Sequence, residues 1–411
     1  MSEHDLKPAT TGRGSRKRRV ADDEEKQTRR RALIAHLVAD QGIEESKVAD
    51  VLCAMFGISV ARCTVTRDLQ WARRHGWIVT HLGEDCPGRE HLDAVKQTAH
   101  FYDGLQKALQ EGSGGTLRAL HVFWSGPCRA DEDDGWDGRL QRFSKRASPT
   151  LLDLLARAER IGVTWGRTIG ENIEAVAAAT SRGQIKPQPN VTIVPTSGEP
   201  LGGARAQFAS TDLAERLSAI LGGSNVPSLR GISPVIPEEF RGHDHATVLR
   251  FIRGLRSFRE VFGDAGAAGI VAQLDTVLTS AGSFGERYHA FQNEFVRIPG
   301  LSREKLGELA LGDVGGVLIQ KDGGFSKAQQ KAFAALRDLW TGIRIDDFRR
   351  VSASARENGR PGVILSAVGA NKADITLALT CRERLVNHLI IDETLATRLS
   401  ELVNRAKIAA A

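Results

Sequence analysis

Three small or polar residues stand where a predicted strand gives way to a predicted helix. The run 160–165 is predicted as a buried strand, and Gly166, Arg167 and Thr168 separate it from a predicted helix over 169–179. A helix start presents free backbone N–H groups and the positive end of the helix dipole, so this segment predicts an anion site. The alternative is a turn that needs its glycine for conformation alone. The glycine spacing is neither GxGxxG nor GxxxxGK[ST], so no dinucleotide or P-loop cofactor is predicted.

Small polar residues also follow other predicted strands of the chain. Because ligands of parallel α/β sheets bind outside the carboxyl ends of the strands, we expect these loops to converge on a pocket for a polar ligand. Lys372 precedes a predicted helix over 373–380, where it could meet an anion or, alternatively, be a solvated lysine. The residues that these loops contribute to the predicted site are Ser197, Gly282, Ser283, Asp313, Gly315 and Lys372.

The second set of candidate residues lies in the N-terminal part of the chain. Apolar spacing predicts short helices around 33–38, 44–55 and 64–74, which is a helix-turn-helix pattern. The third helix of such a unit enters the major groove, where short polar side chains, Arg and Gln read base edges. The alternative is a bundle that only packs. The residues expected to contact DNA are Arg62, Thr64, Thr66, Arg67 and Gln70.

One departure concerns the turn of this unit. Residues 60–63 make the turn longer than a compact one, so either the third helix starts earlier or the turn is loose.

The charge of the chain is concentrated near its N-terminus. Of the formal net charge of +6, residues 1–31 supply ten Lys or Arg against six Asp or Glu, centred on 16–19 and 29–31. Such a segment fits contact with a phosphate backbone, and the alternative is a solvated arm. Residues 32–90 hold six basic and eight acidic residues. We therefore expect the arm to supply general attraction to double-stranded DNA and the third helix to supply selectivity.

The pattern along the chain predicts four parts. Residues 1–21 are predicted as a disordered basic arm, 22–90 as the helix-turn-helix domain, 91–116 as a linking helix and 117–411 as one large domain. In the last part short β-rich runs alternate with amphipathic helices. That alternation predicts an α/β fold with a Rossmann-like, mostly parallel sheet.

Composition excludes several classes of protein. No apolar run is long enough for a transmembrane helix, and the basic N-terminus lacks the apolar stretch of a secretory signal. The five cysteines form no CxxC pair, which indicates a reducing cytoplasm and no structural zinc. We expect a cytoplasmic protein with no membrane partner, metal, cofactor or catalytic residue. The cysteines are Cys53, Cys63, Cys86, Cys128 and Cys381.

Four motifs over residues 117–405 resemble the SorC/DeoR-type sugar-binding transcriptional regulators, especially the SorC branch. They read Ile161 to Thr168, Gly312 to Gly316 with Asp322-Gly323, Val368 to Lys372, and Leu385 to Glu393 with Ala396. The N-terminal unit resembles the same family through the VTRDL segment of its third helix. The loop Ser280-Ala281-Gly282 departs from the Gly-Ile-Gly that the family more often has, and the chain exceeds the usual family length.

The resemblance implies a fold like that of ribose-5-phosphate isomerase, glucosamine-6-phosphate deaminase and CoA transferases. It implies a regulator gated by a sugar or phosphosugar effector and assembled as a homotetramer or homodimer. By position, Gly166, Arg167 and Thr168 would form the phosphate or hydroxyl loop, Lys372 would bind the effector, and Asp313 and Gly315 would face it. Two other functions stay open, a sugar-phosphate isomerase- or deaminase-like enzyme with an appended helical domain and a scaffold without ligand.

Overall fold

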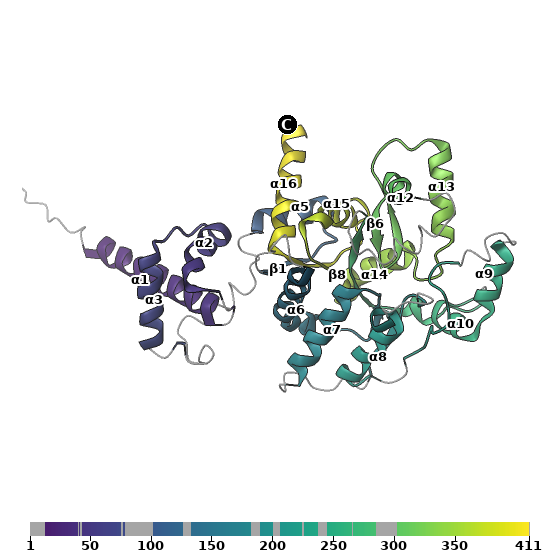
Figure 1. The fold of residues 1–411 in the computed structure, drawn as a ribbon, viewed down its shortest axis with the longest axis horizontal. Helices are drawn as coiled ribbons and strands as arrows, with labels where there is room; N and C mark the ends of the chain where they lie inside the picture. The colour runs from purple at the N-terminus through teal and green to yellow at the C-terminus, as the bar shows by residue number, and fades with distance from the viewer. Residues whose placement is uncertain are drawn as a thin grey trace, which may run out of the picture. The chain divides into compact units, whose positions relative to one another are not determined.

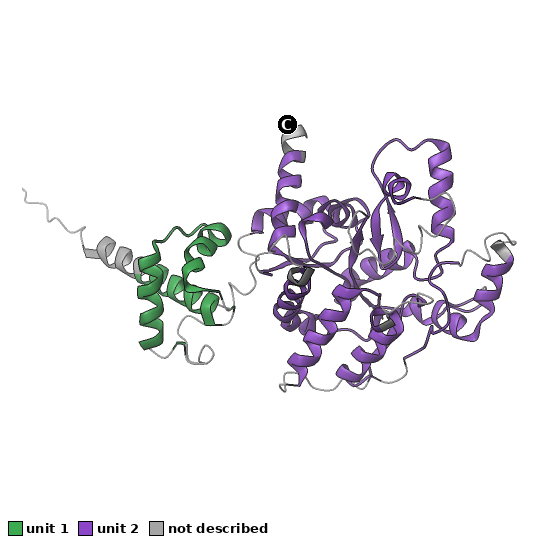
Figure 2. Ribbon diagram, viewed as in Figure 1, with its two compact units in different colours: residues 1–101 green, residues 102–411 purple. Residues whose placement is uncertain are grey.

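The computed structural model divides the chain into two compact units, Met1–Phe101 and Tyr102–Ala411, which are described one at a time (Figure 2). Among the described helices, none combines the length and apolar character that crossing a membrane requires. The structure describes residues 13–39, 41, 43–74, 77–78, 102–125, 133–181, 190–199, 206–223, 226–236, 245–264, 266–284 and 302–410.

Unit 1 contains three described helices, α1 (Arg13–Ala39), α2 (Glu45–Phe56) and α3 (Arg62–Arg74). Helix α1 begins inside the segment 1–21 that was expected to be a disordered arm. Its Arg, Lys, Ala and Glu residues are good helix formers and extend the helix toward the N-terminus. Apolar side chains from all three helices are buried together, among them Ala32, Leu33, Ile34, Val48, Leu52, Val65, Leu69 and Ala72.

The turn between α2 and α3 is compact. Gly57 ends α2 in the left-handed conformation, with a φ of 61°, and its amide donates to the carbonyl oxygen of Cys53 at 3.1 Å. The amide of Ile58 donates to the carbonyl oxygen of Leu52, also at 3.1 Å. Because α3 already begins at Arg62, the long turn suggested by residues 60–63 does not form, and of the two alternatives the earlier helix start is correct.

Unit 2 is built on a six-stranded sheet whose neighbouring strands are all parallel, in the order β1-β9-β8-β4-β2-β3. This confirms the predicted α/β fold. The last strand of the chain, β9, lies between the first strand, β1, and β8. The strands are β1 (Ala119–Phe123), β2 (Arg160–Val163), β3 (Thr192–Pro195), β4 (Thr276–Thr279), β8 (Gly362–Ala367) and β9 (His388–Asp392).

Helices cover both faces of this sheet (Figure 1). The described helices of unit 2 are α5 (Asp103–Gly112), α6 (Asp133–Leu155), α7 (Arg167–Thr180), α8 (Ser210–Leu221), α9 (His245–Gly254), α10 (Arg256–Phe262), α12 (Arg303–Leu309), α13 (Lys327–Asp338), α14 (Ile345–Asn358), α15 (Ala373–Leu377), a π-helical turn (Ala378–Arg382) and α16 (Glu393–Ala410). Short 3-10 turns are Ala206–Phe208, Ile270–Gln273 and Ala370–Lys372.

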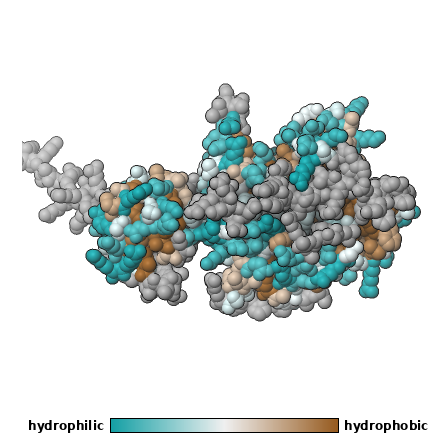
Figure 3. All heavy atoms as spheres, in the orientation of Figure 1, coloured by the Kyte–Doolittle hydropathy of each residue, from teal (hydrophilic) through white to brown (hydrophobic). Residues whose placement is uncertain are grey.

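Two hydrophobic clusters occupy the two faces of the sheet. Within β8, Ile364 belongs to one cluster while Val363 and Leu365 belong to the other, as the alternation of side chains along a strand requires. The cluster around Ile364 is completed by α6, α7 and α8, and the other by α5, α14, α15 and α16. Hydrophilic side chains cover most of the described surface of unit 2 on the face drawn in Figure 3.

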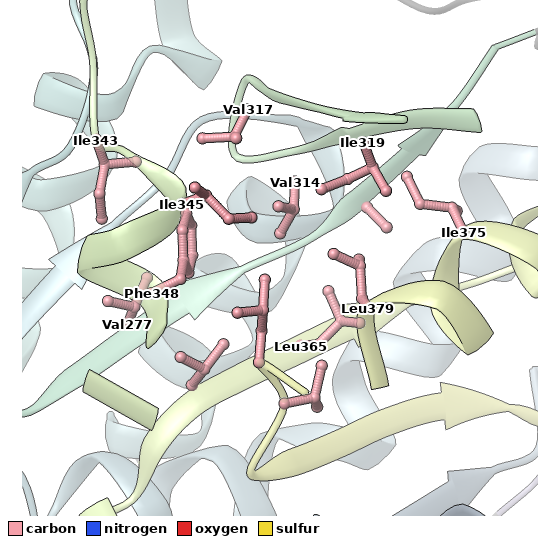
Figure 4. Packing of buried hydrophobic residues seen from close by; sticks show 14 of the residues in the cluster. Val277, Val314, Val317, Ile319, Ile343, Ile345, Phe348, Leu365, Ile375 and Leu379 are labelled. Carbon is pink, nitrogen blue, oxygen red and sulfur yellow. The ribbon is translucent and has the colours of Figure 1, made fainter. Parts of the chain in front are cut away.

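A second, antiparallel sheet continues from the end of β4. It consists of β5 (Ala281–Ser283), β6 (Ala310–Val314) and β7 (Val317–Gln320). The sequence indicated loops at 280–283 and 312–316, yet most of these residues pair as strands. The pairing is close, because a Cβ at Gly312 would lie 1.9 Å from the carbonyl oxygen of Gly282. Figure 4 shows Val314, Val317 and Ile319 of this sheet packed among side chains of the main core.

The described end of the predicted linking helix belongs to unit 2. Leu105 and Leu109 of α5 are buried in the core of that unit. Residues 91–101 of the predicted linking helix lie outside the described residues.

Candidate functional site

The loop after β2 joins a largely buried strand to the start of a helix. Gly166 has a φ of 125°, which suits glycine, and its amide donates to the carbonyl oxygen of Phe208 at 3.0 Å. Helix α7 begins at once with Arg167, and no side chain caps its first turn. Thr168 is buried. The first-turn amides and the positive end of the dipole of this 14-residue helix therefore lie at the carboxyl edge of the parallel sheet.

Lys372 lies at the same edge, after β8. It is 5% exposed, and Gly369 before it has a φ of 101° and donates its amide to Asp392 Oδ1 at 3.0 Å. The Nζ atom of Lys372 lies 6.0 Å from the ring centroid of Trp136, at the start of α6. The ring of Trp136 also lines Gly369, since a Cβ there would be 3.2 Å from it. The hydrogen bond from Gly369 to Asp392 and the packing of the indole ring thus fix the loop that carries Lys372.

The start of α6 brings Lys372 and Arg167 to one place. Arg167 forms an ion pair with Asp137, the residue next to Trp136. Two cations from loops more than 200 residues apart in sequence therefore meet around two consecutive residues of one helix. Trp136 and Asp137 were not predicted, because the acidic run at 131–134 before them indicates a surface loop, whereas α6 begins at Asp133.

The β6–β7 turn packs directly on the ends of β2 and β4. Thr164 Oγ1 donates to Thr279 Oγ1 at 3.2 Å, and both residues are fully buried. Gly315 lies against this pair with a φ of 54°, and a Cβ there would be 2.5 Å from Thr164 Cγ2. Asp313 Oδ2 accepts the amide of Gly316 at 2.8 Å. Asp313 and Gly315 thus shape the turn that closes over the strand ends.

The remaining residues predicted from strand ends lie at different distances from Lys372. Gly282 pairs with Asp313, and Ser283 pairs with Gly312, in the antiparallel sheet. Ser197 follows β3, three strands away from β8 in the sheet, which corresponds to about 14 Å. Its hydroxyl is buried and has no hydrogen-bond partner among the described residues. The structure therefore brings Arg167 and Lys372 to the start of α6, whereas Ser197 follows the strand beside β2 and lies away from Lys372.

A buried group of charges at the ends of β1 and β9 was missed by the sequence analysis. Arg139 of α6 forms an ion pair with Asp392, whose side chain is fully buried, and its Nε donates to Ser125 Oγ at 2.8 Å. Glu393 Oε2 accepts the amide of Ser125 at 2.6 Å. Burial, with a further contribution from Asp392, raises the pKa of Glu393 to about 7.

Two further arginines of α6 hold the chain that leaves β1. Arg142 Nε donates to the carbonyl oxygen of Ser125 at 2.8 Å, and Arg146 donates to that of Trp124. Burial lowers the pKa of Arg146 to about 10. The signal in the sequence is the spacing of Arg139, Arg142 and Arg146, which places three cations on one face of a helix. Among the described residues, no three His, Cys, Asp or Glu side chains are grouped to hold a metal ion.

In unit 1, α3 presents most of the predicted DNA-contacting residues to solvent. Arg62, Thr66, Arg67 and Gln70 are exposed, and Thr64 is half-buried. On the opposite side Val65, Leu69 and Ala72 pack into the core. Arg67 Nη2 approaches Thr64 Oγ1 at 3.5 Å. The helix therefore has one apolar face and one face of Arg, Thr and Gln.

This exposed face has the side-chain chemistry of base and phosphate recognition. Arg62 lies 3.8 Å from Asp50, and both are well exposed, so this pair constrains the arginine little. Arg67 and Arg74 form no salt bridge with any described residue.

Comparison with known proteins gives matches by structure. No protein-family model and no curated protein sequence matches the chain. The full-length sorbitol operon regulator SorC from Klebsiella pneumoniae matches with a TM-score of 0.52 and 19% identity, over 92% of this chain and 99% of that chain. A DeoR family transcriptional regulator from Listeria monocytogenes matches with a TM-score of 0.50 and 17% identity, over 72% of this chain and 99% of that chain. The chain therefore shares the fold of these two regulators.

Proposed function

We propose that this chain is a DNA-binding transcriptional regulator of carbohydrate uptake or catabolism genes, gated by a sugar or phosphosugar effector. One observation carries the proposal: a single chain joins a helix-turn-helix unit with an exposed Arg, Thr and Gln face to an α/β unit that gathers Arg167, the start of α7 and Lys372 at one edge. The shared fold with two regulators supports it. The regulator acts in the cytoplasm as a homodimer or homotetramer.

The residues have separate roles in this proposal. Arg62, Thr64, Thr66, Arg67 and Gln70 contact an operator in the major groove. Arg167, Thr168 and the first-turn amides of α7 hold an anionic or hydroxyl group of the effector, and Lys372 neutralises it. Gly166 allows the close approach of the loop, while Asp313 and Gly315, with Gly282 and Ser283 beside them, form the turn that closes the site. Ser197 is the outermost member of the set.

The effector half is tested by thermal unfolding against a panel of sugars and sugar phosphates. A ligand that binds the folded state raises the free energy of unfolding by RT ln(1 + [L]/Kd), about 2.7 kcal/mol at 100 times Kd. Lys372→Met should abolish the shift given by the active compound, and Lys331→Met, at an exposed position on α13, should keep it. An unshifted panel, or a shift that Lys372→Met leaves intact, would count against this site.

The DNA half is tested by mobility shift on the duplex upstream of the chain's own gene. Binding should weaken steeply with salt and change when the active sugar compound is added. Arg67→Ala should lower the specific affinity about fivefold or more, because an Arg contact to a base contributes about 1–3 kcal/mol. Specific binding that survives Arg67→Ala would refute the assignment of α3.

One observation favours the alternative enzyme function. The pKa of Glu393, raised to about 7, is suited to a general acid or base. Both oxygens of its carboxylate, however, already interact with Ser125, by way of the amide and the hydroxyl. We therefore assign Glu393 a structural role, and turnover of a phosphosugar that is lost in Glu393→Gln would reverse that assignment.

A further inference from the structure

Helix α3 carries a carboxylate on the side opposite its exposed arginines. Asp68 follows Arg67 directly, yet its side chain is fully buried. Arg30 of α1 donates from Nε to Asp68 Oδ2 at 2.8 Å, and Arg31 donates from Nε to Asp68 Oδ1 at 3.1 Å. Each carboxylate oxygen thus has its own arginine. A buried carboxylate requires such partners, because leaving it unpaired is strongly unfavourable.

Arg31 makes a second contact, with an aromatic ring of α3. The guanidinium of Arg31 lies 4.2 Å over the ring centroid of Trp71, which is also on α3. Trp71 in turn meets Trp77 edge to face, with 4.8 Å between ring centroids. The side chains of Arg30 and Arg31 are 25% and 17% exposed. Both arginines therefore point into the helix interface, although the sequence placed them in a basic run expected to attract phosphates.

We propose that Asp68, held by Arg30 and Arg31, is the positioning residue of the DNA-reading helix. The inference rests on the proposed DNA binding. The two hydrogen bonds from adjacent residues of α1 fix both the rotation of α3 about its axis and its position along that axis. A rotation by one residue, about 100°, would turn Arg67 away from the face it now occupies. Arg30 and Arg31 thus act through Asp68 on base recognition and make no phosphate contact.

The test uses the full-length protein and two duplexes: one selected by the wild-type protein from a random pool, and a scrambled duplex of equal length. Each phosphate contact contributes about 0.9 to the slope of log affinity against log salt. Arg31→Gln should leave that slope unchanged on the scrambled duplex and raise the Kd of the selected duplex at least tenfold. The control Arg29→Gln, an exposed neighbour on α1, should leave the preference between the two duplexes unchanged.

Asp68→Asn distinguishes an electrostatic role from a positioning role, because the two roles predict opposite changes in affinity. It adds one positive charge, so an electrostatic role alone predicts tighter binding, whereas the positioning role predicts at least tenfold weaker binding to the selected duplex at an unchanged salt slope. Arg31→Lys keeps the charge but not the planar group over Trp71, so it should also bind the selected duplex at least tenfold more weakly. This variant keeps the test valid if Arg31→Gln does not fold.

Failure of the positioning role can be distinguished from failure of the proposed DNA binding. A lower salt slope in Arg31→Gln, or tighter selective binding by Asp68→Asn, would overturn the positioning role while DNA binding stands. A wild-type protein that enriches no duplex and binds neither would overturn the proposed function itself and the inference with it.

Discussion

Two histidines on neighbouring strands give the stability of unit 2 a defined pH dependence. His121 and His388 stack at 6.0 Å between ring centroids, and burial lowers the pKa of each to about 4. The unfolded chain takes up these protons near 6.5, whereas the folded state does so only near 4. Stability from this pair is therefore present above pH 6.5 and is lost as the pH falls toward 4. Calorimetry should show a smaller drop in Tm from pH 7 to pH 5 in the double variant His121→Phe with His388→Phe, and equal drops would contradict the pair's role.

Glu393 acts in the opposite direction. Its folded pKa of about 7 lies above the ordinary 4.5, so its contribution to stability is present below pH 4.5 and is lost as the pH rises through 7. Glu393→Gln keeps the acceptor for the amide of Ser125 and removes the charge. Between pH 5 and 8 the wild type should lose up to about 3 kcal/mol relative to this variant in denaturant unfolding. Glu401→Gln, exposed on the same helix, is the control and should follow the wild type.

At the scale of single residues, the sequence allows a prediction where the neighbouring residues in the chain determine the role. Arg167 and Lys372 could be proposed as site residues because a helix start follows a strand end at each. Arg139 could not be found, because its partner Asp392 lies 253 residues away and only the pairing of β1 with β9 brings the two together. Arg30 and Arg31 stood in a basic run for which phosphate contact and a solvated arm both stayed open. Their pairing with Asp68 could not be predicted, because the burial of Asp68 depends on how the helices pack.

At the scale of elements, the β6–β7 turn is sensitive to the smallest added side chain. Gly316 has a φ of 95°, and a Cβ there would lie 2.0 Å from the ring of Trp340, which is itself buried. Gly316→Ala should therefore cost more than about 2 kcal/mol in urea unfolding. Gly324, where a Cβ would meet no atom within 4 Å, is the matched control and should change by less than about 0.5 kcal/mol. If Gly316→Ala leaves the free energy of unfolding unchanged, the turn can move away from the ring of Trp340.

The elements that the sequence predicted are those whose own residues favour them. The strands of the parallel sheet are apolar, and β4 and β8 are buried along their whole length. By contrast β5 consists of Ala, Gly and Ser, which have little β propensity, and it exists because β6 pairs with it. The helix expected over 373–380 changes to a π-helical turn at Ala378, which no local pattern marks.

At the scale of the whole molecule, the net charge of +6 allows a test that is independent of the operator. Residues 1–19 contain six Lys or Arg and two Asp or Glu. Deleting them should lower affinity for a scrambled duplex and reduce the salt slope, while the preference for a selected duplex over the scrambled one persists. Fluorescence anisotropy between 50 and 200 mM salt measures both quantities. A slope unchanged by the deletion would place the phosphate contacts elsewhere in the chain.

The place of β9 in the sheet also has a consequence for synthesis on the ribosome. Because this last strand lies between β1 and β8, the sheet of unit 2 cannot close until residues 388–392 have been made. The three described helices of unit 1 are complete more than 300 residues earlier. The nascent chain therefore carries a finished N-terminal unit while β1 and β8 still expose unpaired edges, the state in which strands pair wrongly. A premature stop before residue 388 would make that state permanent.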